Sequence, residues 1–268
     1  MTHLRIPRLL TSLAAALLLT ACVSNHGPKA ELAVPQSVPP ADLAGLTLEV
    51  GDQKGGTEAL LRAGGELDNA PYKIHFSTFT SGPPQIEAAT AGKIDFAVTG
   101  NTPPIFGAAA GAKIRVVAAY ANSAAGDQIL VPAASPIHSV ADLRGKKVLV
   151  GKGTSANGHL LLQLQKAGVD VKDVQFVYLQ PADAFTALSQ GQADAWAIWD
   201  PYTALAQKQL KVRTLVTAES VTNGYGFGVA SIAALEDAKR NTALADLVQR
   251  IARASLWAQA HPDRKSTR

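Results

Sequence analysis

Two short apolar runs recur along the chain in the same polar setting. They lie in the segments AGKIDFAVTGNTPPIF (91–106) and GQADAWAIWDPY (191–202). Short apolar runs bounded by turn residues are typical of buried β-strands. We therefore expect one strand in each segment. The matching polar positions are Gly92 with Gly191, Asp95 with Asp194, and Asn101 with Asp200.

Each of these strands is expected to lead directly into a helix. Asn101 is followed by Thr102 and Pro103, and Asp200 by Pro201. Asparagine and aspartate are preferred N-cap residues, and proline is favoured in the first turn of a helix. The free N–H groups of a helix N-terminus can hold an anion without a basic side chain. Two such ends facing each other would form an anion clamp.

The repeat continues upstream and covers most of two units. Strands are expected at 46–50 and 74–79 in the first unit and at 147–150 and 174–179 in the second. Strands that alternate with helical segments predict an α/β fold, with a mainly parallel sheet flanked by helices in each unit. Ligands of such sheets bind at the carboxyl ends of the strands. The loops that follow the strands are therefore the candidate functional regions.

The glycine-rich loop at 51–57, GDQKGGT, follows the first predicted strand. It is not a phosphate-binding P-loop, because the lysine and the serine or threonine required after the second glycine are missing. Two interpretations remain: a ligand-facing loop in which Gln53 and Thr57 offer hydrogen bonds, or a structural turn. Lys54 is expected to be solvated. In the next loop, Gly82 would let the backbone approach a ligand, or the loop is only a connection.

The loop at 151–156, GKGTSA, fits the dinucleotide-binding pattern G-x-G-x-x-A between a strand and a helix. The following strand ends at Gln180, where a ribose-binding Asp or Glu would be required. We therefore favour a second interpretation. In it Thr154, Ser155 and Asn157 cap the next helix and present amides and hydroxyls to an anion.

Several single residues have a structural as well as a functional interpretation. Asp95 and Asp194 are expected to stabilise the turn that enters a strand. Trp196 is expected in the core. Trp199, at the end of its strand, could form an aromatic wall for an organic ligand or simply pack.

Composition excludes several functional classes. The chain has 25 basic and 21 acidic residues, which is no basis for binding nucleic acid. The six histidines show no metal-ligand spacing, and none belongs to a recognisable nucleophile motif. We therefore expect no cofactor, no metal and no enzymatic activity.

The N-terminal segment resembles a bacterial lipoprotein signal. Arg5 and Arg8 precede an apolar run at 13–19, which is too short to span a membrane, and Leu-Thr-Ala-Cys follows at 19–22. The resemblance implies a signal peptide at 1–21 and acylation of Cys22, the only cysteine. The alternative is an ordinary secretory signal with a spare thiol. Residues 22–42, rich in Pro, Ala and Ser, are predicted to be a tether.

From residue 46 onward the chain resembles the aliphatic sulfonate-binding proteins of ABC importers. That family lies within a wider group of nitrate, bicarbonate, taurine and thiamine-precursor binders. The resemblance rests on GDQKGG, TGNTPPIFGAAAGA, SPIHSVADLRGKKV, GKGTSANGHLLL, PADAF and DAWAIWDPY. It implies a type II periplasmic-binding-protein fold of two α/β lobes joined by two crossovers. The expected lobes are 43–122 with 224–268, and 123–223. The family extends further, so we expect the C-terminal part of the first lobe to be shortened.

The resemblance implies that a small organic anion, above all a sulfonate, binds between the lobes. A periplasmic, membrane-anchored and monomeric protein would pass it to a permease and its ATPase. Nitrate, bicarbonate or a thiamine pyrimidine precursor are alternative ligands, and a cleft enzyme or a dinucleotide-binding oxidoreductase is the alternative class. Asn101 replaces a frequent Asp of the family, which favours a more anionic ligand or one without an amine. The expected ligand contacts are Gln53, Gly82, Asn101, Thr102, Thr154, Ser155, Asn157, Trp199, Asp200 and Tyr225.

Overall fold

The computed structural model describes residues 32–262 of the chain. The predicted signal peptide at 1–21, Cys22 with its predicted acyl group, residues 22–31 of the predicted tether and the tail at 263–268 lie outside this range. Within the described range, no helix is both long and apolar enough to cross a lipid bilayer.

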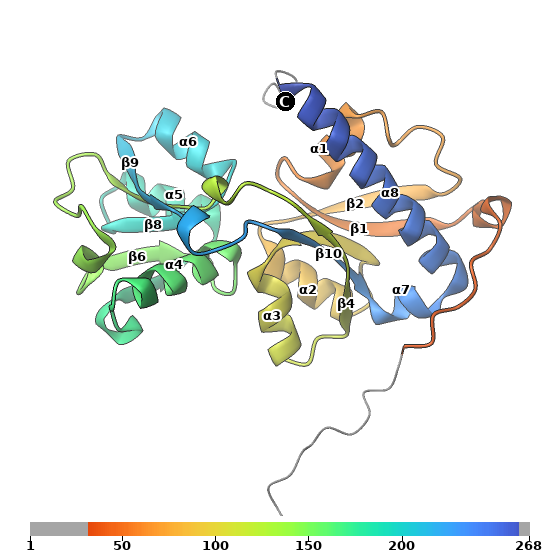
Figure 1. Ribbon diagram of the computed structural model, residues 1–268, viewed down its shortest axis with the longest axis horizontal. Coiled ribbons are helices and arrows are strands. Elements are labelled where there is room, and N and C mark those ends of the chain that lie inside the picture. The colour runs from red at the N-terminus through yellow and green to blue at the C-terminus, as the bar shows by residue number, and fades with distance from the viewer. Residues whose placement is uncertain (1–31, 263–268) are drawn as a thin grey trace, which may run out of the picture. The chain divides into compact units, whose positions relative to one another are not determined.

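Residues 32–262 form two five-stranded sheets, each flanked by helices (Figure 1). The first sheet has the strand order β2-β1-β3-β10-β4, with β1 (Thr47–Gln53), β2 (Lys73–Phe79), β3 (Phe96–Gly100), β4 (Ile114–Tyr120) and β10 (Gly226–Ser231). The second has the order β7-β6-β8-β5-β9, with β5 (Gln128–Pro132), β6 (Lys147–Val150), β7 (Gln175–Tyr178), β8 (Ala195–Ile198) and β9 (Val212–Thr217). The predicted fold, two mainly parallel α/β sheets, is confirmed.

Each sheet contains one antiparallel strand, and that strand is the one that enters from the other sheet. The chain leaves β4, crosses at 121–127 and enters the second sheet as β5, antiparallel to β8 and β9. It returns at 218–225 and enters the first sheet as β10, antiparallel to β3 and β4. The predicted lobe boundaries themselves remain a prediction.

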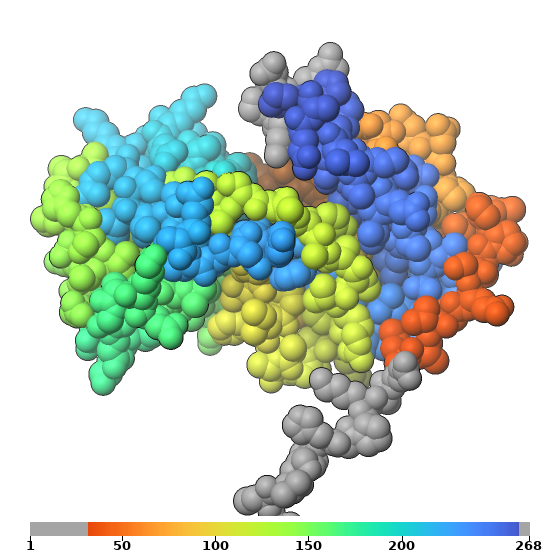
Figure 2. All heavy atoms as spheres, in the orientation of Figure 1, coloured from red at the N-terminus to blue at the C-terminus, as the bar shows by residue number. Residues whose placement is uncertain are grey.

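The two crossovers run side by side. The N–H of Ala218 donates to the carbonyl of Asp127 at 2.9 Å. A Cβ on Gly224 would lie 2.5 Å from the backbone nitrogen of Ala124, so only glycine fits there. Both segments are visible at the surface in Figure 2, the first in yellow-green and the second in blue.

The helices follow the strands as the sequence pattern predicts. The helices of the first lobe are α1 (Thr57–Ala63), α2 (Gly82–Thr90), α3 (Thr102–Ala109), α7 (Ile232–Glu236) and α8 (Ala238–Ala260), and α8 packs on α1 and β1. Those of the second lobe are α4 (Ser155–Lys166), α5 (Pro181–Ser189) and α6 (Tyr202–Gln209). Short 3₁₀ helices lie at Pro40–Leu43, Ala124–Gly126, Val140–Leu143, Val171–Asp173 and Ala218–Ser220.

Asp95 and Asp194 confirm the structural interpretation of the repeat. The carboxylate of Asp95 accepts from the N–H of Glu49, and that of Asp194 accepts from the N–H of Lys147, both at 2.8 Å. In each lobe the aspartate thus joins the start of the third strand to the first strand. Trp196 is fully buried, as expected.

Candidate functional site

The carboxyl ends of the parallel strands carry most of the predicted site residues. β1 is longer than expected, because its pairing with β2 continues to Gln53 opposite Phe79. Gln53 therefore ends a strand and does not lie in the loop. Its side-chain nitrogen donates to the side-chain oxygen of Gln85 at 2.9 Å and to the carbonyl of Val98 at 3.4 Å.

Asn101 occupies the N-cap position of α3, but its side chain does not cap the helix. Its backbone is already helical, with φ −70° and ψ −28°, so the side chain cannot reach back to the N–H groups. Its oxygen instead accepts from the hydroxyl of Thr102 at 3.0 Å. The predicted position is correct, and the predicted capping hydrogen bond is wrong.

Asp200 is not the N-cap of the helix that follows β8. Pro201 takes that position, and α6 begins at Tyr202. Asp200 is exposed, and its carboxylate accepts from the hydroxyl of Thr203 one turn ahead. Its backbone N–H donates to the carbonyl of Gly126 at 3.1 Å. Asp200 therefore joins the end of β8 to the first crossover.

The start of α4 is capped by Thr154, one of the three residues that were predicted to cap it. The hydroxyl of Thr154 accepts from the N–H of Asn157 at 3.3 Å and donates to the carbonyl of Gly151 at 2.7 Å. The side-chain oxygen of Asn157 accepts from the N–H of Gly153 at 3.0 Å. Thr154 and Asn157 are both buried, so these two side chains hold the loop together.

Ser155 faces an acidic group that the sequence interpretation did not identify. Its hydroxyl donates to the carboxylate of Asp127 at 3.1 Å. Burial raises the pKa of Asp127, the hydrogen bond from Ser155 lowers it, and the nearby Asp200 carboxylate raises it; together they bring the pKa to about 6. The first crossover therefore places a carboxyl group beside the N-terminus of α4.

The structure brings the starts of α3 and α4 together. A Cβ on Gly100 would lie 2.8 Å from the Cβ of Ser155, and a Cβ on Gly158 would collide with the Thr102 hydroxyl. The two glycines thus permit a close contact between lobes. The pairing differs from the expected one, because the start of α3 meets α4 and not α6. Gly82 makes its close approach to Pro103, at 2.6 Å from a hypothetical Cβ.

The two predicted aromatic contacts differ in exposure, because Trp199 is half-buried and Tyr225 is exposed. Trp199 follows β8 and packs against both apolar clusters of the second lobe, with its ring edge-to-face on Tyr202 at 6.2 Å. Tyr225 lies in the second crossover and is exposed. Its backbone N–H donates to the side-chain oxygen of Asn223 at 3.0 Å.

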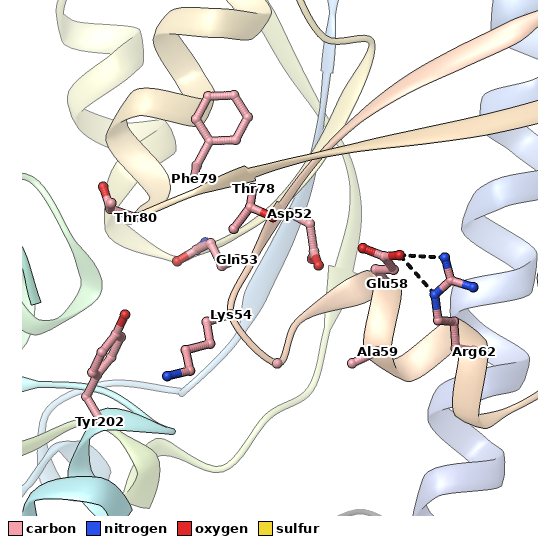
Figure 3. A pocket seen from close by; sticks show the side chains of 11 residues that line it. Asp52, Gln53, Lys54, Glu58, Ala59, Arg62, Thr78, Phe79, Thr80 and Tyr202 are labelled. Carbon is pink, nitrogen blue, oxygen red and sulfur yellow. Dashed lines mark hydrogen bonds and ion pairs between the residues drawn. The ribbon is translucent and has the colours of Figure 1, made fainter. Parts of the chain in front are cut away.

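A pocket of about 570 Å³ opens at the ends of β1 and β2 (Figure 3). Pockets of 300–1,000 Å³ are typical of small-molecule sites. Most of its wall belongs to the first lobe, and Tyr202 comes from the second. The pocket is lined by Asp52, Gln53, Lys54, Gly55, Glu58, Ala59, Arg62, Thr78, Phe79, Thr80 and Tyr202. Of the predicted contacts, only Gln53 lines it.

Sequence reasoning therefore missed Lys54, Tyr202 and Asp127. Lys54 was expected to be solvated, and it is exposed, but its place in the pocket wall was not predicted. No local motif marks Asp127. Their positions depend on how the lobes and crossovers meet. The repeat could have indicated Tyr202, because this residue begins a helix that follows the carboxyl end of a strand, where ligands of such sheets bind.

The sequence matches the model of one protein family over more than half of its length. The family model described as NMT1/THI5 like matches residues 80–265. This chain belongs to that family.

Individual relatives support the predicted resemblance. A protein of Escherichia coli strain K12 that is named for binding aliphatic sulfonates is 44% identical over 171 residues, which are 63% of this chain and 54% of the relative. The chain spans about half the length of the relatives that it matches by sequence.

Two solved structures share the fold and part of the sequence. The periplasmic aliphatic sulphonate binding protein SsuA from Escherichia coli has a TM-score of 0.68 and 35% identity, over 82% of this chain and 76% of that one. The alkanesulfonate-binding protein SsuA from Xanthomonas axonopodis pv. citri, bound to MOPS, has a TM-score of 0.64 and 32% identity, over 79% and 80%.

Proposed function

We propose that this protein is the substrate-binding component of an ABC importer and captures a small organic anion, above all an aliphatic sulfonate, between its two lobes. The observation that carries the proposal is the similarity to SsuA proteins at 32–35% identity over about four fifths of the chain. One of those proteins is bound to MOPS, which is itself an organic sulfonate. The proteins named here are binding proteins, which favours capture and delivery over catalysis.

We keep the ligand contacts that the sequence predicts, but the hydrogen bonds in the structure give some of these residues a different role. Thr154 and Asn157 would act by holding the α4 loop in shape. Asn101, Thr102 and Ser155 would face the ligand when the lobes separate and the α3–α4 contact opens. The backbone N–H groups at these helix starts are suited to an anionic group.

We further propose the cellular setting that the sequence indicates. Cys22 would carry the lipid anchor of a periplasmic lipoprotein, and residues 22–42 would form its tether. The lobes 43–122 with 224–268 and 123–223 would close on the ligand. The closed monomer would then deliver it to a permease and its ATPase, without a cofactor.

A thermal melt with and without ligand tests this proposal. A ligand at 100 times its Kd adds about 2.7 kcal/mol, which raises the Tm of a protein of this size by about 5–10 °C. We expect this shift with alkanesulfonates. A shift with nitrate, bicarbonate or a pyrimidine precursor alone would replace the sulfonate by that ligand. A cooperative melt that none of them moves would contradict the proposal.

The helix starts are tested separately. Asn101→Ala combined with Ser155→Ala should weaken the binding of every anion that binds the wild type. Unchanged affinity for all of them would show that the anion is held elsewhere. Val116→Thr, on the exposed edge strand β4, is a suitable control, because this position lies outside both the pocket and the helix starts.

A further inference from the structure

The charged residues of the pocket differ in whether they already have partners. The carboxylate of Asp52 accepts from the N–H of Thr57 at 2.6 Å. Glu58 forms an ion pair with Arg62, at 2.6 Å between the guanidinium and the carboxylate. Among residues 32–262, no carboxylate lies within ion-pair distance of Lys54. Lys54 is thus the charge in this pocket that remains available to a ligand.

Lys54 also lies where the two lobes approach each other. It follows β1 of the first lobe, and its ammonium lies 6.0 Å from the ring centre of Tyr202, the first residue of α6 in the second lobe. Figure 3 shows the side chain extending across the pocket toward this ring. An exposed contact of this kind contributes little and is readily exchanged for a stronger one.

The rest of the wall suits an organic group with an anionic end. Ala59 and the Tyr202 ring offer apolar surface, and Thr78 and Thr80 offer hydroxyls, whereas the Phe79 ring packs against the apolar interior of the first lobe. A sulfonate has three acceptor oxygens, which match the three donors of an ammonium group. The Tyr202 ring is the apolar surface best suited to hold a short alkyl chain.

We propose that Lys54 binds the anionic head group of an organic sulfonate in this pocket, and that the ring of Tyr202 covers its organic part. The ligand thereby joins the two lobes. This inference rests on the proposed capture of an organic sulfonate. It places the head group on Lys54 and not at the helix starts of α3 and α4, which do not line this pocket, and it names the residues that would decide affinity and size selection.

The chain contains a matched control for the lysine. Lys152, in the loop after β6, lies 5.8 Å from the ring centre of Tyr178. This pair has nearly the same geometry as Lys54 and Tyr202, but neither residue lines the pocket. Lys152→Gln therefore removes a lysine over a tyrosine, with the same change in net charge.

Isothermal titration with 1-butanesulfonate tests the role of Lys54. We expect Lys54→Gln to raise Kd at least tenfold and Lys152→Gln to change it less than twofold. The neutral analogue butane-1-sulfonamide should bind weakly, and equally to all three proteins. A Kd for Lys54→Gln within twofold of the wild type would overturn the inference. Because Lys54 is exposed, the variant should melt like the wild type.

A chain-length series tests the role of Tyr202. The wild-type affinity should rise from methanesulfonate to butanesulfonate, and Tyr202→Phe should retain this rise while Tyr202→Ala loses it. An unchanged rise in Tyr202→Ala would overturn the covering role. If the wild type binds no sulfonate, the proposed function fails together with this inference. If it binds tightly and Lys54→Gln binds equally well, the inference alone fails.

Discussion

The two lobes place different kinds of polar side chain in their interiors. In the described residues, the buried charged side chains are Asp52, Asp95 and Arg250, and all three belong to the first lobe. The buried polar side chains of the second lobe are uncharged, apart from the titratable His159. Burial lowers the pKa of His159 to about 4. The strand–helix repeat thus buries charged side chains in one copy and neutral groups in the other, while the half-buried Asp127 lies in the first crossover, outside the repeat.

The strand-entry aspartates show the difference at one pair of equivalent positions. Asp95 also pairs with Arg240 of α8, whereas Asp194 borders a polar hollow at the surface. Helix α8 supplies Arg250 as well, which pairs with Asp246 and donates to the carbonyls of Glu66 and Asp68. The first lobe therefore depends on a helix that comes after the second lobe in sequence.

Arg250→Met should have the largest effect on stability. It leaves the Asp246 carboxylate without its ion pair and several partly buried carbonyls without a donor, which costs about 3 kcal/mol. Chemical denaturation measures this loss. Arg253→Met, at an exposed ion pair with Glu66, should cost much less. Equal losses in the two variants would contradict the importance of the buried network.

Acid should bring a charge into the neutral lobe through His159. Its pKa is about 4 in the folded protein and about 6.5 when unfolded, so the unfolded chain binds more protons between these values. Stability should therefore fall as the pH drops from about 6.5 to 4, by about 2–3 kcal/mol. Denaturation curves across this range should show a smaller acid loss in His159→Gln. The same acid loss in both proteins would assign the pH dependence to other groups.

Asp127 should act in the opposite direction over nearly the same range. Its pKa is raised to about 6 in the folded protein, so the folded state binds the extra proton, and stability falls as the pH rises from about 4 to 6. Asp127→Asn should therefore raise the stability at pH 8 by about 1–3 kcal/mol and leave it unchanged near pH 4. Ser155 can still donate to the amide oxygen. No gain at pH 8 would show that the carboxylate is well solvated.

The substitutions Asp95→Asn and Asp194→Asn should have the smallest effects on stability. They compare equivalent positions of the two lobes most directly. An amide oxygen can still accept from Glu49 or Lys147, so only the charge is lost. Asp95→Asn should cost about 1–2 kcal/mol, because Arg240 loses its partner, and Asp194→Asn less than about 0.5 kcal/mol. The difference in denaturation midpoint measures the charge effect. Equal costs would mean that Arg240 contributes nothing at this site.

The sequence predicted the features that depend on local pattern. The repeat located the strands, the order of elements and the role of Asp95 and Asp194, because turn residues and apolar runs act over a few neighbours. The length of β1 depends on pairing with β2, so Gln53 was misplaced into the loop. Asp200 was misassigned as a cap, because a proline that follows a polar residue can take either of two positions.

The site was predicted less completely than the fold. Thr154 could be recognised as a cap, since both partners of its hydrogen bonds lie within three residues of it in the sequence. Lys54 meets Tyr202 only after two crossovers have placed the lobes, and Asp127 lies in a crossover without a local motif. The pattern of hydrophobic residues carries no information on such distant pairs.

The exchange of one strand between the two sheets also sets an order of events during synthesis. All five strands of the second sheet lie between residues 128 and 217, so this sheet can be completed once they have emerged from the ribosome. In the first sheet, β3 and β4 are separated by β10, which ends at Ser231. The first sheet therefore stays incomplete, with the facing edges of β3 and β4 unpaired, until β10 has been translated. By then all strands of the second sheet have already been translated.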